Sequence, residues 1–318
     1  MSRGTTTFAF VKDRWDEATR QVREALDNLL GSFPTGEVID ADSRAMRELA
    51  EEPQLAIRAE GGKSTGRSPW GETPVRTAHS IAALHVHLAV DCARAFLVLV
   101  DYDAPVIFGV GPVARASLEN FARARWLYDP DISTRLRVAR AMNDRLEGLR
   151  QQARLPHPDA RRSAGRARDL LKAAKSLGLP IVKGARDTKW IAEVRPSSTR
   201  LMAALIDFSE EIGLVGYNFL SGVDHGLPHG LNPFLRMELN SPFSIYGKAQ
   251  VSLDSNLANT IGALLISGSV QALEEQSSFL GITRDSWSPA AGRGLQAVLA
   301  WSERRDLAKR ARSGDNDR

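Results

Sequence analysis

The segment with the most chemistry in the chain runs from Tyr217 to Gly226, with the sequence YNFLSGVDHG. If a helix continues past Ser221, then Tyr217, Ser221 and His225 lie on one face at four-residue steps. Histidine changes charge near neutral pH, so His225 is the natural general acid or base. The alternative is a plain helix end, where a cationic His225 favours the helix dipole and Gly226 supplies a left-handed cap. A serine and a histidine on one helix do not by themselves predict acyl transfer.

A second candidate is Arg115, which stands four residues before Glu119 in a stretch otherwise rich in alanine and apolar residues. Arg123 and Trp126 share the same helix face. Because an unpaired charge inside a protein is strongly destabilising, we expect Arg115 and Glu119 to be paired. The pair is either a structural ion pair or the floor of a polar pocket, and the sequence leaves both alternatives open.

The residues that usually bind metals or nucleotides form no recognised pattern. Three histidines, His79, His85 and His87, stand in one expected helix but do not share a face. The sequence GGKST at Gly61–Thr65 is similar to part of a phosphate-binding loop. That motif needs a glycine where this chain has Ile57, so we expect a flexible surface loop instead. We therefore predict no metal and no cofactor.

Positive charge gathers in Arg135–Lys175, which holds 12 basic and 4 acidic residues, whereas the whole chain carries a net charge of only +4. The arginines are spread around the helices that contain them, and few aromatic residues stand between them. Single-strand binding normally combines basic grooves with stacking aromatics. We expect a solvated basic face here, and we keep RNA or another polyanion as the partner that this segment would bind.

The periodicity of apolar residues predicts an all-α chain. The clearest stripe runs from Thr77 to about Val100, and a second long helix from Val110 to Tyr128 follows after a short connection. Such a pair packs as an antiparallel hairpin, which we place at the centre of the bundle. Residues 178–196 leave a short helix and a strand both open. No alternating run is long enough to predict a sheet. Further helices are expected at residues 12–30, 132–155, 159–177, 201–219 and 245–280, with a last one ending near 310.

Composition and length favour a globular protein in the cytoplasm. Of 318 residues, 43% are hydrophobic and 25% charged, which is ordinary for a packed domain. The one cysteine, Cys92, excludes an internal disulfide, and neither a secretory leader nor a membrane span is expected. We divide the chain into N-terminal helices (1–60), a flexible loop (61–75), the main helical bundle (76–310) and a disordered tail (311–318).

Two stretches resemble a family of helical bacterial proteins whose function is not assigned. The first joins VARASLE, ending at Glu119, to ARWLYDP, ending at Pro130, and RVARAMN, ending at Asn143. The second is the segment from Tyr217 to Gly226. The family pattern is an R-x-x-x-E helix, a WL-x-DP helix end and a later Y-x-x-x-S-x-x-x-H-G. The resemblance covers about residues 76–230, and the family is similar in turn to the HEPN (higher eukaryotes and prokaryotes nucleotide-binding) helical bundles.

The resemblance implies that Arg115 and Glu119, on the central hairpin, face Tyr217, Ser221 and His225. HEPN ribonucleases act as dimers and carry an arginine four to six residues before a histidine on one helix. This chain departs from that pattern, because residues 218–221, four to seven before His225, are Asn, Phe, Leu and Ser. An arginine–histidine pair can therefore only be assembled between helices, as Arg115 with His225.

Two hypotheses for function follow. The first is a HEPN-like ribonuclease or a defence or toxin-type protein, acting as a homodimer, with His225 as general acid or base. In that hypothesis Arg115 binds phosphate, and Glu119 orients either His225 or Arg115. Tyr217 and Ser221 contact the substrate. The alternative is a non-enzymatic helical scaffold or oligomerising binding protein, in which the same residues hold helices together.

Overall fold

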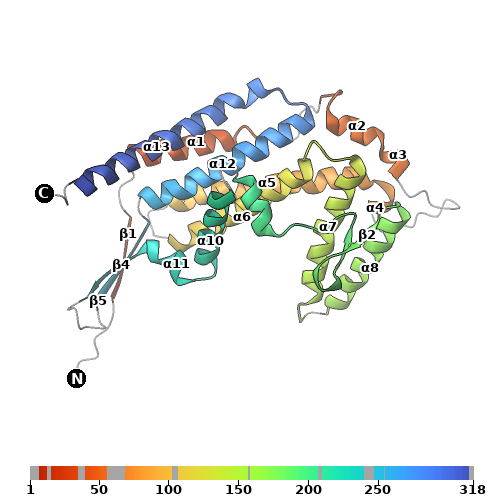
Figure 1. Ribbon diagram of the computed structural model, residues 1–318, viewed down its shortest axis with the longest axis horizontal. Coiled ribbons are helices and arrows are strands. Elements are labelled where there is room, and N and C mark those ends of the chain that lie inside the picture. The colour runs from red at the N-terminus through yellow and green to blue at the C-terminus, as the bar shows by residue number, and fades with distance from the viewer. Residues whose placement is uncertain are drawn as a thin grey trace.

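The computed structural model describes residues 7–12, 16–34, 40–55, 69–101, 107–156, 158–206, 210–239, 247–253 and 255–314. Over these residues the chain is an all-α bundle with a small sheet attached (Figure 1). The sheet lies at the end of the molecule where both termini are found. Toward the opposite end, α7 (Thr134–Ala153) packs against α5, and α8 (Ala160–Ser176) lies beyond α7 and projects from the bundle.

The centre of the bundle is the hairpin of α5 (Pro74–Asp101) and α6 (Val110–Tyr128), as the sequence predicted. The two helices pack closely because α5 presents fully buried alanines to its neighbours, at positions 78, 82, 89 and 93. Helix α6 also packs against α9 (Ser198–Leu205), α10 (Glu210–Asp224) and α12 (Ser255–Leu280). Since α6 is surrounded in this way, its charged side chains must find partners inside the protein.

A layer of three helices covers this hairpin. It consists of α1 (Glu17–Leu30), α12 and α13 (Ser288–Gly314), which pack against one another while α12 packs against α6. Short helices complete the fold: α2 (Arg44–Ala50), α3 (Glu52–Leu55), α4 (Pro69–Glu72) and α11 (Pro228–Leu231). Four helices begin at a side chain that accepts a backbone N–H bond three residues on, the caps being Asp16, Ser43, Ser133 and Ser197.

The small sheet has the strand order β1 (Thr7–Lys12), β5 (Gly247–Leu253), β4 (Leu235–Leu239). Strand β1 runs parallel to β5, and β4 runs antiparallel to it. The prediction that no sheet would form is wrong, and the helix expected from residue 245 begins only at Ser255. Strands β4 (LRMEL) and β5 (GKAQVSL) do alternate apolar and polar residues, but over 5 and 7 residues only.

Residues 178–196 take the strand alternative. Strands β2 (Ile181–Lys183) and β3 (Lys189–Ile191) form an antiparallel hairpin. The Asn143 side chain of α7 holds β3 in place. Its Nδ2 donates to the Ile191 carbonyl at 2.8 Å, and its Oδ1 accepts from the Ile191 N–H at 2.8 Å. The hairpin is therefore attached to α7 through a buried side-chain amide.

Several helix limits differ from the predicted ones. The first helix begins at Glu17, because residues 7–12 form β1. The helical stretch predicted over 201–219 is two helices, α9 and α10. The last helix, α13, continues to Gly314, and residues 315–318 lie outside the described residues. The GGKST segment at 61–65 also lies outside them.

Candidate functional site

Helices α6 and α10 meet closely, and this meeting brings the predicted residues together. A Cβ atom added to Gly111 of α6 would lie 2.4 Å from Val223 Cγ1 of α10, so only glycine allows this approach. Helix α10 continues past Ser221, which was the condition for Tyr217 and Ser221 to share a face with His225, and it ends at Asp224. Gly226 then adopts a φ of 65°, and the Leu227 N–H bonds to the Gly222 carbonyl at 2.8 Å. This is the left-handed glycine cap that the plain-helix-end alternative predicted, and it places His225 directly after the last residue of α10.

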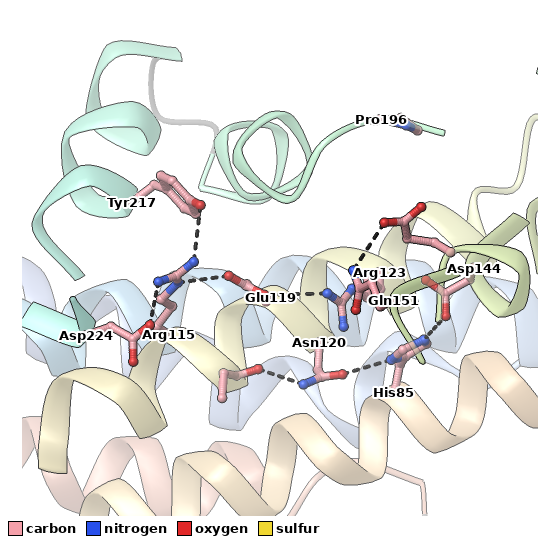
Figure 2. Close-up of polar contacts among 12 residues, drawn as sticks. His85, Arg115, Glu119, Asn120, Arg123, Asp144, Gln151, Pro196, Tyr217 and Asp224 are labelled. Carbon is pink, nitrogen blue, oxygen red and sulfur yellow. Dashed lines mark hydrogen bonds and ion pairs between the residues drawn. The ribbon is translucent and has the colours of Figure 1, made fainter. Parts of the chain in front are cut away.

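Arg115 of α6 contacts side chains from both helices. Its Nε donates to Glu119 Oε1 at 2.9 Å, its Nη1 to Asp224 Oδ2 at 2.7 Å, and its Nη2 to the Tyr217 hydroxyl at 3.3 Å. Figure 2 shows Arg115 between Tyr217 and Asp224, with Glu119 leading along α6 toward Arg123. All three guanidinium nitrogens therefore have a protein partner.

His225 is the fifth member of this group, which we call the Arg115 cluster: Arg115, Glu119, Tyr217, Asp224 and His225. Nη1 of Arg115 lies 3.4 Å from Nε2 of His225. Because a guanidinium has no acceptor, this contact is a hydrogen bond only while Nε2 is unprotonated. A protonated imidazole would instead be repelled by Arg115, and the Asp224 carboxylate beside it would offset that repulsion.

The Arg115 cluster is largely buried on α6 and exposed to solvent at the end of α10. The side chains of Arg115 and Glu119 are only 15% and 17% exposed, whereas Asp224 is 36% exposed and His225 lies in solvent. Burial alone lowers the pKa of Arg115, but the hydrogen bond and charge of Glu119, with Tyr217 and Asp224, raise that pKa above its ordinary value. The cluster thus holds a permanent cation beneath an accessible imidazole, an arrangement that can bind an anion and exchange a proton with it.

Two details of the predicted site change. Ser221 lies half-buried on α10, and within the part of the chain that is described no side-chain contact joins it to Arg115. Asp224, which the sequence placed beside the histidine without a role, makes the shortest contact with Arg115. The geometry therefore brings Arg115, Glu119, Tyr217 and His225 together, adds Asp224 and leaves Ser221 aside.

A second polar network lies farther along α5 and α6, on the right of Figure 2. His85 bonds through Nδ1 to Asn120 Oδ1 at 2.8 Å and through Nε2 to Asp144 Oδ2 at 3.0 Å. Arg195 Nη2 donates to the other Asp144 oxygen at 2.8 Å. Burial would raise the pKa of Asp144, but the bonds and charges of His85 and Arg195 hold it well below its usual range. This histidine has a structural position, since both of its nitrogens are occupied.

The two most buried charges in the described residues, Glu48 and Arg137, belong to a third group, the Glu48 cluster: Glu48, Arg137, His79 and Arg44. Arg137 donates from Nε and Nη2 to the two Glu48 oxygens at 2.8 and 3.1 Å, and both side chains are only 1% exposed. His79 Nε2 and Arg44 Nε approach the same carboxylate at 3.1 and 3.0 Å. Burial would raise the pKa of Glu48, but these bonds lower it to about 2. The cluster ties α2 to α5 and α7.

Sequence reasoning missed the Glu48 cluster, because Arg137 was counted with the basic segment. Its other donors bond the carbonyls of Leu127 and Asp129, and its guanidinium carbon lies 4.3 Å from the centroid of the Phe279 ring. The sequence holds only a weak signal: Arg137 shares a helix face with Ala141, four residues on, and both are buried.

The basic segment 135–175 divides between two helices. On α7, Arg137 and Arg140 are buried, and Arg140 pairs with Asp129 at 2.9 Å and Glu193 at 2.7 Å. The expectation of a solvated basic face is therefore wrong for Arg137 and Arg140, whereas Arg135 and Arg145 of α7 are exposed. On α8 the cations point outward, as expected. They are Arg161, Arg162, Arg166, Arg168, Lys172 and Lys175, all exposed.

The surface grooves found among the described residues lie away from the Arg115 cluster. Two surface grooves, of about 330 and 460 Å³, run along α1, and neither includes a residue of the Arg115 cluster. Among the described residues no group of three His, Cys, Asp or Glu side chains could hold a metal ion. Helix α5 is long and apolar enough to cross a membrane, with a mean hydropathy of 1.7 over its most apolar window, but a core helix has the same composition.

No protein-family model, curated protein or solved structure matches this chain. The likeness to HEPN bundles thus stands on the residue pattern alone, and function has to be argued from the contacts described above.

Proposed function

We propose that the chain is a HEPN-like ribonuclease, located in the cytoplasm and active as a homodimer, whose reacting groups are His225 and Arg115. The observation that carries this proposal is the contact of 3.4 Å between Arg115 Nη1 and His225 Nε2, made between α6 and α10. The HEPN pattern places the arginine on the same helix as the histidine; because α10 lacks an arginine there, this chain can form such a pair only between helices. His225 is also exposed, so a long polymer can reach it.

The proposed reaction is transesterification at one phosphodiester. The ribose 2′-oxygen attacks phosphorus while Nε2 of His225, unprotonated in its contact with Arg115, accepts the 2′-hydroxyl proton. The bond from phosphorus to the 5′-oxygen breaks, and the departing oxygen takes a proton from solvent, which leaves a 2′,3′-cyclic phosphate and a 5′-hydroxyl. Arg115 stabilises the charge on the phosphoryl oxygens. Glu119 and Tyr217 hold the guanidinium in position from two sides.

The test is cleavage of a 30-nucleotide mixed-sequence RNA by the purified protein. His225→Ala should lower the rate about 100-fold or more, the usual contribution of a general base. His87→Ala, which removes an exposed histidine from α5, is the matched control and should leave the rate unchanged. Products carrying a 5′-phosphate, or equal rates for the two variants, would contradict the proposal.

A second candidate function is a non-enzymatic scaffold, and one observation favours it. Each nitrogen of Arg115 already has a protein partner, which is what a contact that joins helices requires. In that case the wild type cleaves no RNA, and His225→Ala lowers the melting temperature instead of a reaction rate.

A further inference from the structure

The outward face of α8 carries positive charge in a straight line. Arg161, Arg168, Lys172 and Lys175 are spaced by seven, four and three residues, which places them within about 60° of one another around a helix. All four are exposed. They span about 21 Å of helix axis. The buried face of α8, formed by Ser163, Leu170 and Ala174, is on the opposite side, so this row of cations faces directly into solvent.

A glycine in the middle of this row has no structural reason in the protein itself. Gly165 lies on the same face, and a Cβ atom added to it would meet nothing within 4 Å. Glycine inside a helix is destabilising relative to alanine. Its lack of a side chain lets another molecule approach the helix backbone between Arg161 and Arg168. We call these five residues the α8 stripe: Arg161, Gly165, Arg168, Lys172 and Lys175.

The surroundings of the α8 stripe extend the positive surface. Between Arg154 and Lys189 the sequence holds ten basic and three acidic residues. The β2–β3 hairpin packs against α8 through β2 and adds three of the ten, Lys183, Arg186 and Lys189, which are all exposed. Helix α8 projects from the bundle at this end of the molecule (Figure 1).

We propose that the α8 stripe binds the phosphate backbone of double-stranded nucleic acid without reading its sequence. A duplex presents a phosphate charge about every 1.7 Å of its axis, which a straight row of arginines and lysines can neutralise. Between Arg154 and Lys189 there is no Phe, Trp or Tyr, and the half-buried ring of Trp190 on β3 is occupied by Arg150, whose guanidinium carbon lies 4.7 Å from the ring centroid, which disfavours a single strand. An anionic membrane is disfavoured too, because an interfacial helix inserts its apolar face and that of α8 is already buried against the protein.

This inference does not rest on the proposed cleavage activity, and a DNA duplex keeps the two apart. DNA lacks the 2′-hydroxyl that the proposed reaction consumes, so it can be bound without being cleaved. Failure to bind DNA leaves the reaction at His225 untouched, and failure to cleave RNA leaves the α8 stripe untouched.

The experiment measures fluorescence anisotropy of a labelled 20-base-pair DNA duplex between 50 and 200 mM salt. The stripe variant carries Arg161→Gln, Arg168→Gln, Lys172→Gln and Lys175→Gln. The control variant carries Arg76→Gln, Arg94→Gln, Arg200→Gln and Arg293→Gln, which removes four exposed charges elsewhere and gives the same net charge. The stripe variant should bind at least tenfold more weakly at 50 mM salt, and its slope of log affinity against log salt should be shallower by about 3.6. The control variant should stay close to the wild type.

A further variant, Gly165→Leu, adds bulk and removes no charge. It should lose affinity at least fivefold while the melting temperature does not fall, since leucine favours the helix. Equal losses in the stripe and control variants, wild-type affinity in Gly165→Leu, or absence of binding at 50 mM salt would overturn the proposal. So would binding to phosphatidylserine vesicles in the absence of duplex binding.

Discussion

The Glu48 cluster and the Arg115 cluster are built from the same kinds of side chain but differ in access to water. Each joins arginine, carboxylate and histidine across two or more helices. In the Glu48 cluster, Glu48 and Arg137 are 1% exposed and the histidine, His79, is 15% exposed. In the second, the arginine is 15% exposed and the histidine stands in solvent. Burial makes the first cluster a structural element. In the second cluster the exposed histidine can exchange a proton with solvent or a ligand.

The largest effect is expected from removing one partner of the buried pair. Arg137→Met leaves the Glu48 carboxylate buried without its main cation, which should lower the free energy of unfolding by about 3 to 5 kcal/mol. Urea denaturation followed by circular dichroism measures it. The double variant Glu48→Met with Arg137→Met removes both charges and should recover much of the loss. A loss below about 1 kcal/mol for the single variant would mean that the cluster is not structural.

The buried carboxylate also predicts a response to acid. The pKa of Glu48 is lowered to about 2 in the folded protein, so its stabilisation is complete above the unfolded pKa of about 4.3. It is lost as pH falls toward 2. The expected contribution is roughly 3 kcal/mol. In Glu48→Gln the free energy of unfolding should change less steeply between pH 5 and pH 2 than in the wild type; Asp144, whose pKa is also lowered, keeps part of the slope.

Arg115→Met should have a smaller effect than Arg137→Met. The Arg115 side chain is partly exposed, and Glu119 keeps Arg123 as a neighbour at 3.5 Å. We expect a loss of about 1 to 2 kcal/mol in the free energy of unfolding. The same denaturation measurement, run beside Arg137→Met, gives the difference directly. Equal losses in the two variants would remove the contrast between the clusters.

The smallest effect on stability is expected from His225→Ala, within about 0.5 kcal/mol of the wild type, because the imidazole lies at the surface. Differential scanning calorimetry of this variant and of His87→Ala should give nearly equal melting temperatures. A clear fall for His225→Ala alone would favour the scaffold over the ribonuclease.

The sequence predicts the helices of this fold well and its buried charges less well. The α5–α6 hairpin is evident from periodicity, because a long stripe of apolar residues at helical spacing predicts a helix and no other element. Strands β4 and β5 were not predicted, since 5 and 7 alternating residues carry too little signal and β1, the other partner of β5, is far away in the chain. The cap at Gly226 was predictable because glycine is the residue that takes a positive φ at little cost.

The charged residues show where prediction from local pattern stops. The pairing of Arg115 with Glu119 is a four-residue spacing on one helix and follows from sequence. Arg137 and Glu48 are 89 residues apart in the chain, and no local sequence pattern predicts that they pair. The Arg115–Asp224 contact spans 109 residues. The resemblance supplied the nearby histidine and not the aspartate.

The pairing of β1 with β5 has a consequence for how the chain is made. Thr7 is the register partner of Lys248, so about 240 residues separate the two strands. At roughly 5 to 20 residues per second a ribosome needs about 12 to 48 s to synthesise that stretch. Throughout this time β1 has no strand to join, while the helices between can already form. The amino-terminal strand is therefore among the last elements that a nascent chain can fix in place.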